Sequence, residues 1–149
     1  MWKLILSILL LCVSFFQAEA QTIQELRSLY HQGEYEAVLQ KLAVPISAAE
    51  LLLCADAQHK LSLFEDAMRS YTQSELLGEQ STDLFLNRAI CAFSMGDFEL
   101  ARRDFLTVKA LKEDKRIPYY FGAMAYLENN FKGATQFLKD ALKIEENYM

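Results

Sequence analysis

The stretch GDFELARRDF, residues 96–105, decides how the rest of the chain is interpreted. It opens with a turn-forming pair and an aromatic residue, and Ala101 and Phe105 follow at helical spacing. Residues four positions apart lie on the same side of a helix. A small residue there lets two helices approach closely, and a large one a turn later fills the space beside it. The stretch therefore predicts a tight turn followed by a closely packed helix.

The same pattern recurs along the chain. Turn-forming residues ending in an aromatic occur four times, with the aromatics 29, 34 and 33 residues apart, at Tyr35, Phe64, Phe98 and Phe131. Each is followed by a small or β-branched residue and, four positions later, by an apolar one: Val38 with Leu42, Ala67 with Tyr71, Ala101 with Phe105, Ala134 with Leu138. Small residues at Ala55, Ala89 and Gly122 recur independently, 34 and 33 residues apart. Such a period is typical of repeated helix pairs.

On these residues the chain resembles the tetratricopeptide-repeat (TPR) family. The resemblance covers 48–80, 82–112 and 116–146 as three full repeats and 22–44 as a shortened, degenerate one. It implies an all-α fold, a short right-handed superhelical solenoid of stacked antiparallel helix pairs. No unit ends in the proline usual in the family, and the usual tryptophan is missing from all three. A generic helical bundle is the alternative, and two residue classes recurring at one interval disfavour it.

Helix-start signals agree with this division. Thr22 and Ser47 are each followed three residues later by Glu, which predicts capping boxes at both sites. Thr82 and Pro118 mark the starts of two later helices, because proline suits a first helical turn.

The first twenty residues have the features of a secretory signal peptide. Lys3 supplies one positive charge, residues 4–16 are apolar, and Ala18-Glu19-Ala20 has the small-x-small form of a cleavage site. Cleavage would leave Gln21 as the first residue. A retained membrane anchor is the alternative, and a spanning helix would need about 20 apolar residues. The chain resembles a lipoprotein only loosely, because bulky Leu11 precedes Cys12.

Charge and cysteine content narrow the classes of partner and compartment. The net charge of −5 offers no clustered basic surface for nucleic acid. After cleavage two cysteines would remain, Cys54 and Cys91, both among apolar residues of expected helices. A disulfide between them and two separate buried thiols are both open at this point.

In TPR proteins the first helix of each pair lines a concave face that binds peptides or partner helices. The resemblance therefore implies a partner-binding groove in this chain, lined by Tyr30, Leu52, Asp56, His59, Leu86, Ile90, Phe93, Tyr119, Tyr126 and Leu127. Such a lining suits an apolar or aromatic-rich segment. The alternative for each aromatic is an ordinary place in the core.

Two more specific kinds of site fit poorly. Some TPR adaptors grip a C-terminal carboxylate, and Asn87 and Arg116 match such clamp positions, but Leu52, Asp56 and Leu86 stand where polar residues would be needed. Asp56 and His59 share a helix face with His31 nearby, which would be a minimal metal site, although ordinary surface histidines are the commoner case. No catalytic motif, phosphate-binding loop or cofactor motif occurs, so the sequence indicates a protein that is not an enzyme and uses no cofactor.

The expected last helix, residues 131–147, carries an apolar stripe at helical spacing. Phe137 and Leu138 cannot both face inward fully, so we expect an exposed apolar surface at Phe137, Leu138 and Leu142. Repeat arrays normally need a polar terminal cap. A homodimer through this helix, or one tightly bound partner, would cover the surface.

The sequence thus predicts an exported, periplasmic or extracellular scaffold or adaptor that binds a protein or peptide partner, with no stable membrane insertion after cleavage. One alternative is a chaperone-like subunit that shields a single client protein. A weaker one is a metal-binding or catalytic protein built on the same helices.

Overall fold

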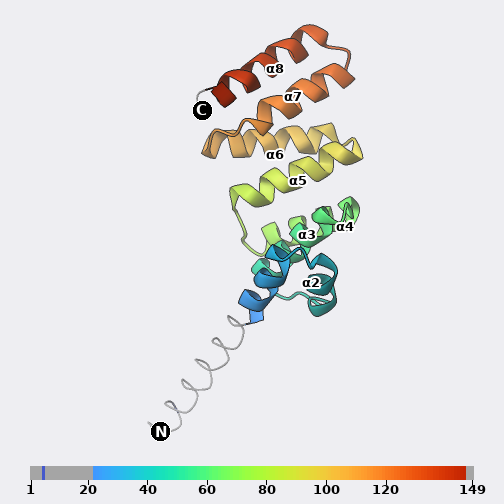
Figure 1. Ribbon diagram of the computed structural model, residues 1–149, viewed down its shortest axis with the longest axis vertical. Coiled ribbons are helices and arrows are strands. Elements are labelled where there is room, and N and C mark those ends of the chain that lie inside the picture. Colours follow the sequence, from blue (N-terminus) through green and yellow to red (C-terminus); the bar gives the residue numbers. More distant parts are fainter. Residues whose placement is uncertain (1–4, 6–21, 147–149) are drawn as a thin grey trace.

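The computed structural model of the protein describes residue 5 and residues 22–146. Residues 22–31 are helical, and the described part contains no strand. The helices that follow are α2 (Tyr35–Lys41), α3 (Ala48–Lys60), α4 (Phe64–Leu76), α5 (Thr82–Met95), α6 (Phe98–Leu111), α7 (Arg116–Leu127) and α8 (Phe131–Glu146). They form antiparallel pairs stacked one above the next (Figure 1). This confirms the predicted all-α architecture of stacked helix pairs.

The expected signal peptide, residues 1–20, lies outside the described residues except for Ile5. Among the described residues, no helix has both the length and the apolar character needed to cross a membrane.

The first helices of the three full pairs begin at Ala48, Thr82 and Arg116, 34 residues apart each time. The Ser47 hydroxyl accepts a hydrogen bond from the Glu50 N–H at 3.3 Å, and the Glu50 carboxylate accepts one from the Ser47 N–H at 3.1 Å. The predicted capping box at Ser47 is therefore confirmed. Ser81, rather than Thr82, caps α5. Pro118 is the third residue of α7 and not its first, which still places it within the first turn, where no N–H donor is needed.

Each helix pair is joined by the same tight turn. One residue per turn has a left-handed backbone, at Gly33, Ser62, Gly96 and Asn129, with φ angles of 84°, 59°, 81° and 62°. In the next residue the N–H donates across the turn to a carbonyl five residues back, as from Asp97 to Ala92 at 2.9 Å and from Asn130 to Ala125 at 2.8 Å. This is the Schellman motif, which satisfies carbonyls left free at a helix end. The aromatic residue of the repeat follows two positions after the left-handed residue.

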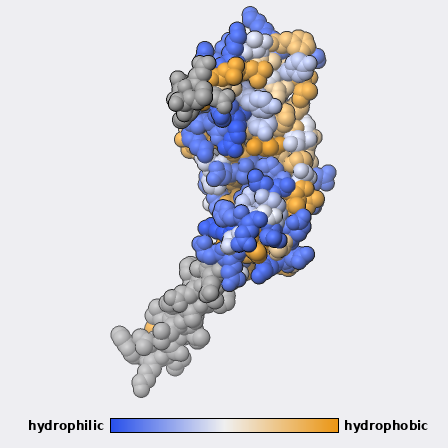
Figure 2. All heavy atoms as spheres, viewed as in Figure 1, coloured by the Kyte–Doolittle hydropathy of each residue, from blue (hydrophilic) through white to orange (hydrophobic). Residues whose placement is uncertain are grey.

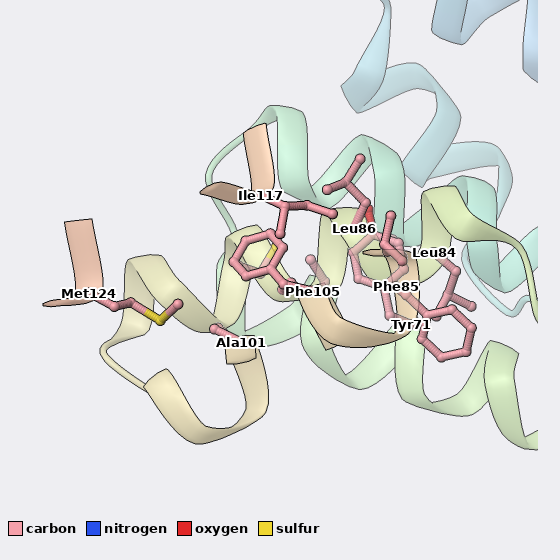
Figure 3. Packing of buried hydrophobic residues seen from close by; sticks show 14 of the residues in the cluster. Tyr71, Leu84, Phe85, Leu86, Ala101, Phe105, Ile117 and Met124 are labelled. Atoms are coloured by element: carbon pink, nitrogen blue, oxygen red, sulfur yellow. The ribbon is translucent and has the colours of Figure 1, made fainter. Parts of the chain in front are cut away.

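The small residues of the repeat lie at the closest helix contacts. Ala55, Ala67, Ala89 and Ala101 have no exposed surface, and Gly122 is also buried. A Cβ atom at position 122 would meet the Leu138 Cγ at 2.9 Å, so α7 and α8 touch there. The main core cluster extends from α3 to α7 and includes Tyr71, Phe105 and Met124 (Figure 3). A second cluster joins residues 22–31 and α2 to α3.

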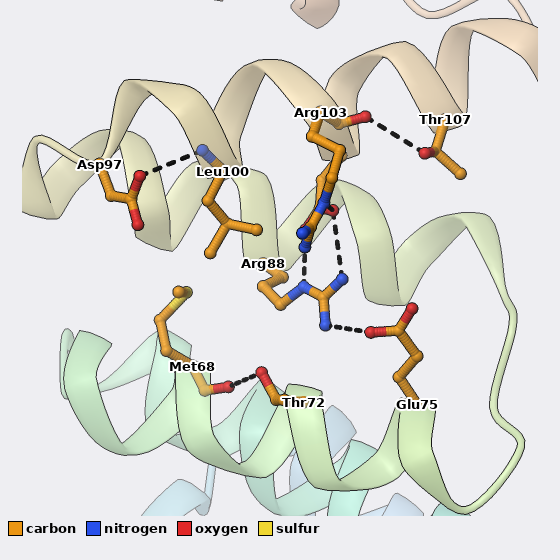
Figure 4. Close-up of polar contacts among 9 residues, drawn as sticks. Met68, Thr72, Glu75, Arg88, Asp97, Leu100, Arg103 and Thr107 are labelled. Atoms are coloured by element: carbon orange, nitrogen blue, oxygen red, sulfur yellow. Dashed lines mark hydrogen bonds and ion pairs between the residues drawn. The ribbon is translucent and has the colours of Figure 1, made fainter.

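A buried ion network ties three successive helices together. Arg88 of α5 is 2% exposed, and its guanidinium donates to both carboxylate oxygens of Asp104 of α6, at 2.6 and 3.1 Å. It also donates to Glu75 of α4 at 2.5 Å (Figure 4). Burial alone would lower the pKa of Arg88, but the hydrogen bonds that it donates to Asp104 and Glu75, together with their negative charges, outweigh burial and raise that pKa. The network therefore links α4 of one helix pair to α5 and α6 of the next.

Cys54 and Cys91 are both buried and both free, so no disulfide joins α3 to α5. Burial raises the pKa of both thiols, that of Cys91 to about 12, with Asp56 adding to the shift at Cys91. These are unreactive, apolar packing groups rather than nucleophiles.

Candidate functional site

The residues predicted to line the groove differ in accessibility. Tyr30, Leu52, Asp56, His59, Ile90 and Phe93 are half-buried. On α7, Tyr119, Tyr126 and Leu127 are 55%, 62% and 56% exposed. Leu86 is 1% exposed and belongs to the main core cluster, so a partner has no access to it and its place in the predicted lining was wrong.

Four of the predicted groove residues also have a role within the fold. The ring near the end of each first helix contacts the aromatic ring that opens the second helix. The four contacts have ring centroids 5.2 to 6.2 Å apart, in the pairs Tyr30–Tyr35, His59–Phe64, Phe93–Phe98 and Tyr126–Phe131. Offset and edge contacts of this kind stabilise the turn that they bridge. These four rings therefore pack within the fold, as the alternative interpretation of the groove aromatics predicted.

Asp56 places a carboxylate in the predicted groove, with the positive charge of Lys60 acting on it. One of its oxygens accepts hydrogen bonds from the Tyr71 hydroxyl at 2.6 Å and the Asn87 amide at 3.0 Å. No ion pair is recorded for Asp56 among the described residues. Burial raises the pKa of Asp56 despite both hydrogen bonds. Burial also raises the pKa of neighbouring Tyr30 to about 12, with Asp56 contributing.

The side chains at the two clamp positions bind acids of the chain itself. Asn87 donates to Asp56, and Arg116 donates to both carboxylate oxygens of Asp114 at 2.9 and 2.7 Å. Hydrogen bonding to Arg116 lowers the pKa of Asp114.

The histidines lie apart from any metal-binding arrangement in the described part of the chain. His31 is exposed, whereas burial and then Lys60 lower the pKa of His59. Among the described residues no group of three or more His, Cys, Asp or Glu side chains is arranged to hold a metal ion.

Two clefts flank the α7–α8 pair. One, of about 370 Å³, lies between the end of α6, α7 and α8, and its floor includes Ile117, Phe121 and Phe137. The other, of about 460 Å³, is called the α7–α8 groove below. It is lined by Lys115, Arg116, Tyr119, Tyr120, Leu138, Ala141 and Leu142. Tyr119 is the only predicted groove residue in either lining, so both clefts extend beyond the site indicated by the sequence.

The predicted C-terminal apolar surface includes one half-buried side chain, Phe137, and two that are more exposed, of which Leu138 also packs against Gly122 of α7. The ring of Phe137 stacks on that of Phe121, with centroids 5.5 Å apart, and Phe137 is half-buried. Leu138 and Leu142 are 41% and 60% exposed. Figure 2 shows apolar side chains, in orange, interrupting the hydrophilic surface over this upper helix pair.

The comparisons with known proteins support the fold. The solved structure of MamA, a TPR-like solenoid, is similar with a TM-score of 0.72 over 85% of this chain and 77% of the MamA chain, at 18% sequence identity. At this identity the likeness shows the fold alone. No protein-family model matches the chain, and no curated protein matches it in sequence. The fold of the protein is therefore TPR-like.

Proposed function

We propose that the protein is a non-catalytic interaction scaffold whose first helices bind an apolar or aromatic-rich segment of another protein. The observation that carries this proposal is the exposure of Tyr119, Tyr126 and Leu127, each more than half accessible on the first helix α7. Leu52 and Ile90 on the preceding first helices are half-buried, so part of each remains available. Aromatic and leucine side chains give a partner large contact area at low entropic cost.

Alanine variants of the first-helix face test this function. Tyr119→Ala and Leu127→Ala should each weaken capture of the partner from the native envelope fraction, since each removes exposed contact area. Leu106→Ala is the matched control, because Leu106 is 51% exposed but lies on the second helix α6. Far-UV circular dichroism should be unchanged for all three. Equal capture by wild type and both α7 variants would contradict the proposal.

The number of proteins captured distinguishes the scaffold from its alternative. An adaptor should retain several envelope or secretion components, whereas a dedicated chaperone-like subunit should retain one client. The half-buried groove residues suit either case. A metal-binding or catalytic protein would instead carry stoichiometric metal after purification.

We also propose that the chain is exported and acts in the periplasm or outside the cell. Support comes from the positively charged start, the apolar run and Ala18-Glu19-Ala20. Intact-mass measurement of exported protein should give a chain that begins at Gln21. Exported protein that retains residues 1–20 would contradict cleavage and favour an anchor.

A further inference from the structure

The second helices of the three full pairs, α4, α6 and α8, carry a large apolar residue at the same repeat position, and its exposure differs among them. Tyr71 of α4 and Phe105 of α6 are fully buried. Phe105 is covered by the next helix, α7, whose Tyr120 ring stacks on it with centroids 5.0 Å apart. The equivalent residue of α8, Leu138, is 41% exposed. Among the described residues, no helix lies on α8 as α7 lies on α6.

The exposed surface of α8 is an apolar stripe beside a groove, an arrangement that can bind a helix. Phe131, Leu138 and Leu142 are 57%, 41% and 60% exposed, and their spacing of seven and four residues puts them on one side of the helix. This stripe is about 16 Å long, or three helical turns. Tyr119 of α7 forms the opposite wall of the α7–α8 groove, whose volume is about 460 Å³. The groove borders the stripe at Leu138 and Leu142, and an apolar strip beside a groove is a common binding site for one amphipathic helix.

Basic side chains lie beside this surface, although the whole chain has a net charge of −5. Lys132 and Lys139 are exposed beside the stripe, and no ion pair is recorded for either in the described part of the chain. Lys115 and Arg116 line the groove itself. Of the nearby acids, Asp114 is held by Arg116, and Asp140 accepts from Gln136 and lies 3.9 Å from Lys143.

We propose that the α8 stripe and the α7–α8 groove bind one amphipathic helix of a second protein, with Asp or Glu along the flanks of its apolar side. The helix would take the place on α8 that α7 has on α6, with an apolar or aromatic side chain against Leu138. Lys132 and Lys139 would pair with its acidic flank. This surface shares Tyr119 with the first-helix face, but its α8 side lies outside that face, and it extends the proposed scaffold to a second partner.

A second copy of this chain fits the surface less well. In an antiparallel two-fold pair that sets Phe131 against Leu142 of the other copy, Lys132 would approach Lys139 of that copy. Like charges at such a contact are destabilising. A head-to-tail arrangement would meet the other end of the stack, where the exposed residues of 22–31 include Gln24, Arg27, Ser28 and His31. Those polar side chains offer no apolar counterpart to the stripe.

Titration calorimetry with two synthetic helices tests the proposal on the purified protein. The first peptide carries Leu and Tyr at every third and fourth position with Glu elsewhere, and the second has Lys in place of Glu. The Glu peptide should bind and weaken as salt is raised, while the Lys peptide should not bind. Leu142→Glu should lower the affinity by about tenfold or more. The double change Lys132→Glu with Lys139→Glu should abolish the preference for the Glu peptide.

Leu76→Glu is the matched control, because Leu76 is 80% exposed at the end of α4. It should leave binding unchanged, and circular dichroism should show all variants folded. Equal binding of both peptides, or equal loss in Leu76→Glu and Leu142→Glu, would overturn the proposal. Concentration-dependent dimers that Leu142→Glu abolishes would assign the surface to a second copy instead. Leu127 lies outside the α7–α8 groove. Loss of partner capture in Leu127→Ala therefore reports on the first-helix face, whereas the peptide titrations report on the α8 surface.

Discussion

Ala101 shows how a single small side chain sets the distance between helices. It has no exposed surface and lies in the core cluster that joins α5, α6 and α7. Ala101→Leu should lower the free energy of unfolding by about 1 to 3 kcal/mol, because added methylenes overfill a close-packed contact. Gly122→Leu should act similarly, since even a Cβ atom there would meet Leu138.

The control for this prediction lies on the same helix. Ala110 is exposed on α6, so Ala110→Leu makes the same chemical change without a packing neighbour to displace. Thermal melts of the three variants give the comparison. If Ala101→Leu and Ala110→Leu melt at the same temperature as wild type, the assignment of Ala101 to the helix contact is wrong.

Asp56 should make stability depend on pH. Burial raises its pKa above the ordinary value of 3.8, so the folded protein binds this proton more tightly than the unfolded chain does. Protonation of Asp56 therefore favours folding, and its contribution grows as pH falls from the raised folded value toward 3.8. Asp56→Asn should remove this gain while keeping an oxygen that accepts from Tyr71.

Urea unfolding of wild type and Asp56→Asn between about pH 4 and pH 7 provides the measurement. The difference in unfolding free energy between the two proteins should shift in favour of wild type as the pH falls. Subtracting the two curves cancels groups that both proteins share, such as Asp114, whose pKa is lowered. A difference that stays constant with pH would show that Asp56 titrates as an ordinary surface carboxyl.

At the scale of elements, all four helix pairs are joined by a turn that contains one residue with a left-handed backbone. Gly96 adopts φ of 81°, and nothing lies within 4 Å of where its Cβ would be. Gly96→Ala should therefore destabilise by about 1 kcal/mol through backbone conformation alone. Ser62, with φ of 59°, should respond in the opposite direction, so Ser62→Gly should be neutral or stabilising.

Denaturant midpoints of the two turn variants test whether Gly96→Ala lowers stability and Ser62→Gly does not. Both substitutions leave the core untouched, so the slope of the unfolding transition should be unchanged. Stabilisation by Gly96→Ala, or a clear loss of stability in Ser62→Gly, would contradict the role given to backbone conformation.

The elements could be predicted from the sequence to different degrees. The turns could be predicted, because Gly96-Asp97-Phe98 and its equivalents each combine turn-forming residues with an aromatic residue directly after them. The start of α7 was not, because Pro118 is tolerated anywhere in a first turn. Arg88 was missed as a structural residue, since its partners Glu75 and Asp104 lie on two other helices. The one available signal was a charged residue in an otherwise apolar helix.

The candidate site was less predictable than the fold, for a related reason. Repeat spacing assigns Leu86 and Ile90 to the same helix, yet the contacts of the neighbouring pair bury Leu86 and leave Ile90 half-accessible. Tyr126 likewise meets Phe131 across its turn, a contact that depends on ring orientation. The exposed stripe on α8 was foreseeable, because Leu138 and Leu142 are apolar at positions on one side of a helix.

At the scale of the whole molecule, stacking gives the protein two distinct surfaces. The first helices present half-buried Leu52 and Ile90 and the exposed side chains of α7, whereas α8 presents an apolar stripe flanked by Lys132 and Lys139. Each pair contacts its neighbours along the stack, with one core cluster from α3 to α7 and a second that joins residues 22–31 and α2 to α3. A rigid array of this kind suits a scaffold that holds more than one partner.

Site-specific photo-crosslinking in the native cell tests the central claim, that the first helices bind a protein partner. A benzophenone side chain is placed at Leu127 of α7, and in a separate protein at Leu106 of α6, two leucines that are 56% and 51% exposed. We predict a discrete crosslinked product from position 127 and none from position 106. No product from position 127, or the same product from both positions, would contradict the account.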